Sequence, residues 1–266
     1  MVHMPATVTG PAAAVTSADA AAPPPSAGTA NARRALGVFR LAIAVIEIVA
    51  LIGNFQYVLE FPLFASLNFF SYFTVQSAML AVVTLLVAAA YALLRPVDPP
   101  LLGAFRTMVT VYLLVSGIVF ALIVSQASTR DYRIDVPWSD TLLHFVVPAL
   151  AVIAWTADSI MAVNPPVPWS TVGWVLVYPT LWLPYTLVRG ADVGWYPYFF
   201  LDEAQVGGAL GVAAYCLLVV AIFVAVTAAL VAVNRALWRR ARGRRARSTG
   251  TPDHRAAPAE APASMR

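Results

Sequence analysis

The sequence predicts an all-α membrane protein, a polytopic bundle of about six transmembrane helices. Hydrophobic residues make up 60% of the 266 residues, charged residues only 11%, and the mean hydropathy is +0.75. A soluble domain of this size has too little interior to bury so much apolar surface. The apolar residues also fall into separate stretches, each long enough to cross a bilayer as a helix.

The predicted spans are residues 36–57, 69–93, 104–126, 140–162, 170–188 and 207–233. In the fifth span, Pro179 and Pro184 remove backbone donors, so we expect an interrupted helix there. Around the spans we predict three parts: a disordered Ala/Pro-rich tail over residues 1–33, a six-helix membrane domain over 34–235, and a basic disordered tail over 236–266.

The distribution of charge predicts the topology. An even number of spans places both termini on one side of the membrane. Arginines gather on the terminal segments and the second loop, namely Arg33, Arg34, Arg95, Arg106, Arg235, Arg239, Arg240, Arg242, Arg244, Arg245 and Arg247. The other side is mostly acidic, with Glu60, Asp131, Asp135, Asp140, Asp192, Asp202 and Glu203 against Arg130, Arg133 and Arg189. The positive-inside rule therefore predicts cytoplasmic termini.

The residue inventory excludes several kinds of chemistry. The chain has 17 arginines and no lysine, so a lysine Schiff base or lysine nucleophile is impossible. Its single cysteine rules out an internal disulfide, and the lack of CxxC, HExxH and clustered histidines predicts no metal and no cofactor. The C-terminal arginines directly follow a span, so we expect no nucleic-acid partner. The Arg, Ala, Val and Pro bias suggests a bacterial inner or plasma membrane protein.

Two polar side chains lie inside otherwise apolar spans, Thr74 in the second and His144 in the fourth. His144 is the only histidine outside the tails, and an ionisable group within a span is costly, so it points to function. Both residues lie seven positions outward from the centres of their spans, near Ala81 and Ala151. At about 1.5 Å per residue, both are roughly 10 Å above the bilayer midplane. They can meet if these two helices pack together.

The histidine has two interpretations, which the sequence weighs evenly. His144 is either a hydrogen-bonded packing residue or a general base near neutral pH. Asp140 lies one turn earlier on the same face and could orient the imidazole, as in a catalytic triad. The alternative makes Asp140 or Ser139 the N-cap of this helix, directly after Pro137.

Thr74 alone is a weak candidate, because threonines in membrane helices commonly bond a backbone carbonyl one turn earlier. With His144 beside it, Thr74 becomes a candidate nucleophile. Glu47, in the middle of the first span, is either a structural partner of a hydroxyl or of Arg40, or a proton or substrate site. Arg189, at the outer end of the fifth span, either binds an anionic group or pairs with acidic residues nearby, namely Asp192, Asp202 or Glu203.

The segments FFSYFTVQSAML, LLHFVVPAL and GWYPYFFLD resemble the androgen-induced and androgen-dependent TFPI-regulating family of membrane proteins. Animal members are similar in topology and act as intramembrane threonine hydrolases on fatty acid esters of hydroxy fatty acids. The resemblance covers roughly residues 36–233. It implies that Thr74 is the nucleophile and His144 the essential histidine. The predicted substrate-binding residues are Asn68, directly before the first of these segments, and Trp195 and Tyr196, within the last.

The sequence therefore predicts an intramembrane lipid-ester hydrolase whose partners are the bilayer and an acyl-ester substrate. Two alternatives remain open. One is a small transporter or permease that uses Glu47, His144 and Arg189, although the lack of an internal repeat counts against it. The other is a non-catalytic scaffold whose buried polar residues serve only packing.

Overall fold

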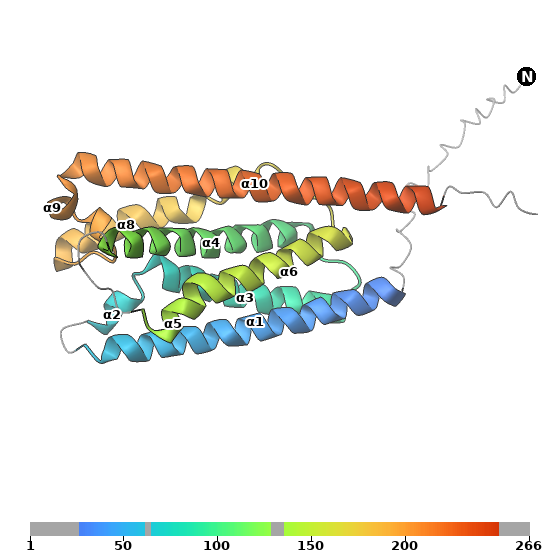
Figure 1. Cartoon of the computed structure of the whole chain (residues 1–266), viewed down its shortest axis with the longest axis horizontal. Helices are drawn as coiled ribbons and strands as arrows, with labels where there is room; N and C mark the ends of the chain where they lie inside the picture. Colours follow the sequence, from blue (N-terminus) through green and yellow to red (C-terminus); the bar gives the residue numbers. More distant parts are fainter. Residues whose placement is uncertain (1–26, 62–64, 129–135, 250–266) are drawn as a thin grey trace, which may run out of the picture.

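The structure is a computed structural model that describes residues 27–61, 65–128 and 136–249, and these form helices and connections without a strand. Six helical segments are long and apolar enough to cross a membrane, which confirms the predicted all-α bundle. Four of them are α1 (Ala27–Leu59), α3 (Phe73–Leu94), α4 (Pro100–Ser128) and α10 (Ala209–Thr249). They run side by side along the bundle (Figure 1).

The remaining two spans are built from several pieces. The fourth consists of α5 (Trp138–Thr141), the π-helical turn η1 (Leu142–Val146) and α6 (Val147–Met161). The fifth consists of α7 (Thr171–Trp174) and α8 (Val177–Val193). Short elements outside the spans are α2 (Ser66–Phe69), η2 (Phe199–Leu201) and α9 (Glu203–Val206). The predicted interruption of the fifth span falls at Val175 and Leu176, whereas Pro179 and Pro184 lie within α8.

Helix α4 occupies the centre of the bundle, in contact with α3, α6 and α10, while α1 packs against α3 and α6. Small residues allow α1 and α3 to approach closely. A Cβ added at Gly37 would lie 3.0 Å from the Leu93 side chain and 3.3 Å from the Ala89 carbonyl oxygen. Such small-residue contacts are what membrane helices use to pack, since lipid supplies no hydrophobic drive for their association. The second and fourth spans are therefore held within one compact bundle.

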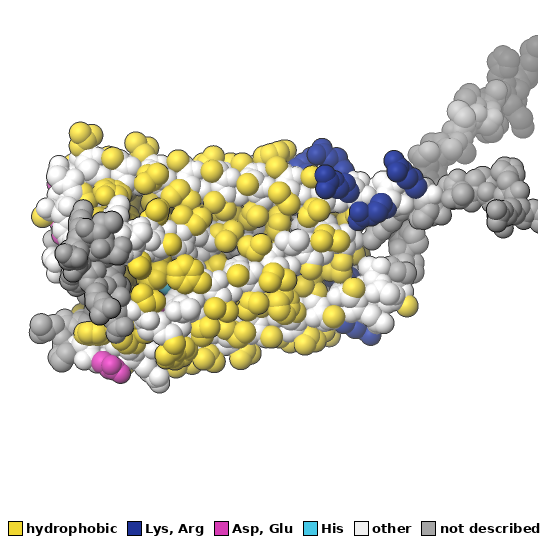
Figure 2. Space-filling model, viewed as in Figure 1, with side chains coloured by type: hydrophobic (Ala, Val, Ile, Leu, Met, Phe, Trp, Pro, Cys, Tyr) yellow, Lys and Arg dark blue, Asp and Glu magenta, His cyan; other side chains and the backbone are white. Residues whose placement is uncertain are grey.

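The surface of the bundle is that of a multi-pass membrane protein. On the face shown in Figure 2, hydrophobic side chains cover the length of the helices, and arginines gather at the end where α10 projects. Helix α1 begins and α10 ends at that same end (Figure 1). The cytoplasmic location of this end remains a prediction from the arginine distribution.

Both predicted domain borders fall inside helices. Helix α1 begins at Ala27 rather than after residue 33, and α10 continues to Thr249 rather than ending at residue 235. Alanine recurs in both extensions and arginine in the C-terminal one, and both are strong helix formers, which explains the extra turns. The rest of the predicted tails, residues 1–26 and 250–266, and the loop residues 129–135 lie outside the described residues.

At the arginine-rich end, five charged side chains from three spans and one loop form a buried network. Asp98 accepts from Arg33 at 2.7 Å and from Arg106 at 2.5 Å. Arg106 also reaches Asp158 at 2.5 Å, and Arg40 lies 3.3 Å from the same carboxylate. Burial raises the pKa of Asp98, but Arg106 and Arg33 lower it by more, so the pKa lies below its ordinary value.

Candidate active site

Thr74 lies at the beginning of a helix rather than within one. The second span was predicted to start at residue 69, but α3 starts at Phe73, after a turn that ends at the N-cap residue Tyr72. Thr74 is thus the second residue of α3, where backbone N–H groups have no carbonyl one turn earlier to bond. Its amide donates instead to the hydroxyl oxygen of Tyr198, at 3.4 Å.

His144 lies in the π-helical turn, and Pro148 gives a local reason for that turn. Proline has no N–H to donate to the carbonyl four residues earlier, which here belongs to His144, and its ring crowds that carbonyl. The chain adopts the wider winding instead, with the Val147 amide bonding the Leu142 carbonyl. The displaced His144 carbonyl lies against Gly117 of α4, where any Cβ would collide with it. Pro148 and Gly117 together set the position of the imidazole.

Two contacts fix the orientation of the His144 ring. Phe120 stacks on it, with centroids 3.9 Å apart and planes inclined by 11°. Nδ1 lies 3.0 Å from the backbone carbonyl oxygen of Asp140. A carbonyl oxygen only accepts, so Nδ1 carries the proton and the neutral ring presents a free lone pair on Nε2.

The predicted roles of Asp140 need correction. Its carboxylate lies 3.9 Å from His144 Nδ1, and it accepts a 2.6 Å hydrogen bond from Asn54 instead. The backbone carbonyl of Asp140, not its side chain, therefore orients the imidazole. The N-cap position belongs to Pro137, and neither Ser139 nor Asp140 makes a side-chain cap. Asn54 on α1 competes for the carboxylate, and sequence spacing alone cannot reveal such a partner.

The hydroxyl of Thr74 meets three side chains. Its Oγ1 lies 3.3 Å from His144 Nε2, 2.7 Å from Ser116 Oγ and 3.4 Å from the Tyr198 hydroxyl oxygen. A threonine hydroxyl offers one donor and two acceptor lone pairs. Since Nε2 only accepts, Thr74 donates to it, and the hydroxyls of Ser116 and Tyr198 donate to Thr74. The four groups form a neutral cluster with every contact satisfied.

Tyr198 is held by aromatic neighbours in the connection between α8 and η2. Its ring stacks on Phe200 with centroids 5.3 Å apart. It packs edge-to-face with Tyr72 at 5.7 Å and at a tilt against Trp182 at 6.0 Å. Burial raises the pKa of the Tyr198 phenol, an effect that its contacts with Thr74 only partly offset. The hydroxyl therefore keeps its proton at neutral pH and acts as a donor.

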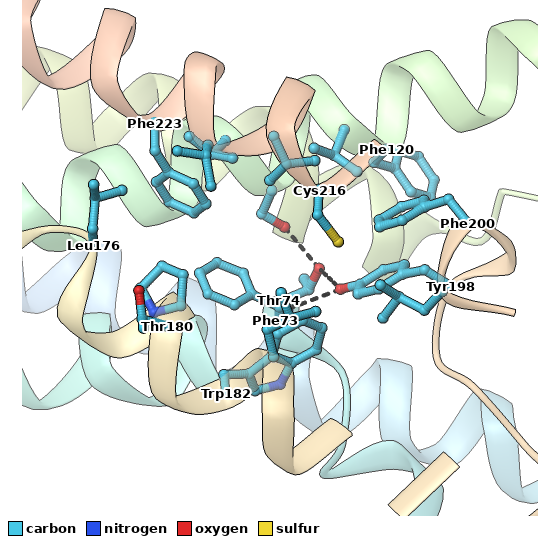
Figure 3. A pocket seen from close by; sticks show the side chains of 18 of the residues that line it. Phe73, Thr74, Phe120, Leu176, Thr180, Trp182, Tyr198, Phe200, Cys216 and Phe223 are labelled. Atoms are coloured by element: carbon cyan, nitrogen blue, oxygen red, sulfur yellow. Dashed lines mark hydrogen bonds between the residues drawn. The ribbon is translucent and has the colours of Figure 1, made fainter. Parts of the chain in front are cut away.

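Thr74, Ser116, His144 and Tyr198 line a cavity of about 310 Å³. Figure 3 shows Thr74 near the middle of the cavity, with Tyr198 and Phe200 to one side and Phe223 and Leu176 to the other. The rest of the wall is almost entirely apolar, with Phe73, Val115, Val119, Phe120, Ile123, Leu176, Pro179, Trp182, Leu183, Phe200, Leu201, Cys216, Val219, Val220 and Phe223 among its residues.

The cavity reaches the lipid-facing side of the bundle. Its lining includes Pro184 on α8 and Val220 on α10, both of which are exposed on the surface. Pro184 also leaves the carbonyl of Thr180 without its helical donor, and Thr180 lines the same wall. The cavity wall therefore extends to the outer surface of the bundle beside α8 and α10.

The predicted supporting and substrate-binding residues lie apart from this cavity. Arg189 donates to the buried Asn68 at 2.7 Å and lies 6.0 Å from the Trp195 ring centroid. No acidic side chain among the described residues forms an ion pair with it, so the expected pairing with Asp192, Asp202 or Glu203 is wrong. Tyr196 packs against Gly190, where its ring occupies the space of a Cβ. None of these residues lines the cavity.

Glu47 also lies apart from the cavity. It is fully buried, and neither carboxyl oxygen has a hydrogen-bond partner among the described residues. The expected partner Arg40 pairs with Asp158 instead. The permease alternative needs Glu47, His144 and Arg189 along one path, yet of these three only His144 lines the cavity.

Sequence reasoning missed Ser116, Tyr198, Phe120 and Gly117. The adjacent Ser116 and Gly117, in the apolar run LLVSGIVF, were the available signal for a polar contact at a close helix approach. Tyr198 was hidden among aromatic residues that a membrane-interface belt explains equally well. Within the described residues, no group of three histidine, cysteine or acidic side chains is placed to hold a metal.

Comparisons of the chain with known protein families, with curated proteins and with solved structures find no match. The resemblance noted in the sequence therefore stays a prediction. The geometry around Thr74 is the basis for assigning a function.

Proposed function

We propose that this protein is an intramembrane hydrolase of acyl esters, with Thr74 as nucleophile and His144 as general base. The observation that carries the proposal is the 3.3 Å contact between Thr74 Oγ1 and the lone pair of His144 Nε2, in the wall of an apolar cavity of about 310 Å³. A nucleophile within hydrogen-bond reach of a base, which a third group orients, is the arrangement that activates a hydroxyl.

The reaction would proceed in two steps. Thr74 Oγ1 attacks the ester carbonyl carbon as its proton passes to His144 Nε2, and the carbonyl electron pair moves onto oxygen. The tetrahedral intermediate expels the alcohol, which takes the proton from Nε2, and an acyl-threonine ester remains. Water then attacks that ester, giving a proton to Nε2. Collapse releases the fatty acid and returns the proton to Thr74.

The cavity favours a lipid substrate. Its walls offer apolar contact to an acyl chain, and they extend to the outer surface of the bundle beside α8 and α10. Burying apolar chain surface contributes about 25 cal/mol per Å² to binding. Fatty acid esters of hydroxy fatty acids, or similar acyl lipids, fit this chemistry, and the sequence resemblance suggests the same class.

The test uses an alkyl fluorophosphonate, which forms a stable adduct with an activated hydroxyl. Purified protein in detergent should be labelled, and peptide mass spectrometry should place the adduct on Thr74 rather than on Ser116. Labelling should be lost in Thr74→Ala and His144→Ala. The matched control is Thr227→Ala, which removes a buried hydroxyl that bonds a backbone carbonyl and does not itself line the cavity. This variant should label like the unaltered protein.

Two results would reject the hydrolase. One is labelling that survives both Thr74→Ala and His144→Ala. The other is an unlabelled protein in which these substitutions change only the thermal stability, the behaviour expected of a scaffold. Substrate-dependent uptake into proteoliposomes that is lost in Glu47→Gln would instead favour the permease.

A further inference from the structure

We infer that the hydroxyls of Tyr198 and Ser116 form the oxyanion site of this enzyme. The inference rests on the proposed hydrolase and adds the groups that would stabilise the negative charge of its tetrahedral intermediate. Both hydroxyls line the cavity, and both lie within 3.4 Å of the oxygen that attacks the substrate.

The hydrogen-bond directions make these two groups donors. Because the Asp140 carbonyl holds the proton on His144 Nδ1, Thr74 donates to Nε2 and its lone pairs accept from Ser116 and Tyr198. When Thr74 Oγ1 bonds to the substrate carbon, it becomes an ester-like oxygen and a weaker acceptor. The anionic oxygen on the adjacent carbon is then the strongest acceptor within reach, and both hydroxyls can rotate toward it.

The backbone of α3 adds to the same effect. Thr74 is the second residue of this 22-residue helix, and its amide already points at the Tyr198 hydroxyl oxygen at 3.4 Å. That amide therefore polarises the Tyr198 O–H group. The positive end of the helix dipole also lies at the place where negative charge would develop.

Tyr198 should contribute more than Ser116 because it is the better acid and the more rigidly held. Its ring is fixed among Phe200, Tyr72 and Trp182, so little reorganisation accompanies the reaction. Ser116 is on α4, and Thr74 Oγ1 is the partner that the structure gives its hydroxyl. Loss of either donor should slow the chemical step while the apolar cavity still binds the substrate.

The experiment measures hydrolysis of p-nitrophenyl decanoate by purified full-length protein in detergent. Tyr198→Phe keeps the stacked ring and removes only the hydroxyl. We expect kcat to fall on the order of 10²-fold with KM changed less than about threefold, which is typical of a lost oxyanion donor. In Ser116→Ala, kcat should fall by a smaller factor. The matched control is Tyr112→Phe, which removes a buried hydroxyl that bonds the Val175 carbonyl away from the cavity; its kcat should be unchanged.

A second measurement separates an electrostatic role from a structural one. An alkyl trifluoromethyl ketone adds to an activated hydroxyl and forms an oxyanion, whereas the matching ether has no carbonyl. Tyr198→Phe should lower the affinity for the ketone by the same factor as it lowers kcat/KM, and it should leave the affinity for the ether unchanged. If both ligands weaken together, Tyr198 only shapes the cavity and the inference is wrong.

The two proposals fail in distinguishable ways. If the unaltered protein neither hydrolyses the ester nor is labelled at Thr74, the hydrolase itself is rejected. If Thr74-dependent hydrolysis is present and Tyr198→Phe retains full kcat, the hydrolase stands and the oxyanion site at Tyr198 is rejected.

Discussion

Buried polar side chains occur at two levels of this bundle, and the two groups differ in charge and in space. Toward the arginine-rich end, Arg33, Arg40 and Arg106 are ion-paired with Asp98 and Asp158. The two cavities lined by Arg40 or Arg106 hold only about 20 Å³ each, roughly the space of one water molecule. Nearer the other end, Thr74, Ser116, His144 and Tyr198 form a cluster without ion pairs, and they line a cavity of about 310 Å³.

The difference separates polar side chains that only stabilise the fold from polar side chains that can react with a ligand. In this inner network three arginines share two carboxylates, and every carboxylate is already ion-paired. The small cavities beside it leave no space for a ligand larger than water. In the outer cluster, formed by Thr74, Ser116, His144 and Tyr198, the hydrogen bonds are satisfied, but one side of Thr74 faces an apolar cavity. We therefore expect inner substitutions to change stability, and outer ones to change reactivity.

The largest expected effect on stability tests the inner network. Asp98→Asn leaves Arg33 and Arg106 without their shared carboxylate, which should destabilise the fold by about 3–5 kcal/mol. Thermal denaturation in detergent measures the loss. Glu203→Gln, on an exposed site in α9, is the control and should change little.

The same difference predicts that Asp98→Asn leaves ester turnover per folded molecule unchanged. A fall in turnover that exceeds the fall in folded protein would mean that the two levels are coupled and that the separation is wrong.

An intermediate effect is expected at Gly117, where a substitution should change both stability and turnover. A methyl group there collides with the His144 carbonyl oxygen, so Gly117→Ala should cost about 1–3 kcal/mol of stability by overpacking. Displacement of the imidazole should also lower kcat by at least about tenfold, since small misplacements of catalytic groups are costly. Gly243→Ala, an open helical position, is the control and should retain both properties. Normal turnover in Gly117→Ala would show that this glycine does not position the histidine.

The smallest effect is the pH dependence of the inner network. The pKa of Asp98 is lower in the folded protein than its ordinary value of about 3.9. A depressed folded pKa contributes stability above the unfolded pKa, and that contribution is lost as pH falls through the folded value. The melting temperature should therefore decrease as the pH is lowered from about 4. The melting temperature of Asp98→Asn should decrease less steeply over the same pH range. Parallel curves for the two proteins would exclude Asp98 as the titrating group.

The sequence predicted the six spans because long apolar runs have few structural alternatives in a membrane. It also predicted that Thr74 and His144 could meet, since both lie seven residues outward from their span centres. The same count fails for Ser116, which lies one residue from the centre of 104–126 yet contacts Thr74. Helix tilt and the late start of α3 at Phe73 shift depth in ways that apolar runs do not encode.

Other parts of the site depend on partners that are remote in sequence. The Asn54 amide takes the Asp140 carboxylate from a position 86 residues away, and Tyr198 reaches Thr74 across 124 residues. Nothing in local spacing distinguishes these contacts from a surface belt or a helix cap. The ion pairs of Arg106 likewise connect α4 to a loop and to α6, and only packing of the whole bundle selects them.

The π-helical turn makes the fourth span sensitive to its length. Such a turn winds one extra residue into a helix, and one residue of α-helix corresponds to about 100° of rotation. Deleting a single residue between 142 and 146 would restore regular winding and swing the outer end of the span to a new angular phase. Hydropathy and span number would be untouched, while the imidazole and the hydroxyl would no longer share a direction. Two membrane proteins with identical hydropathy profiles can thus differ in chemistry by one residue of winding.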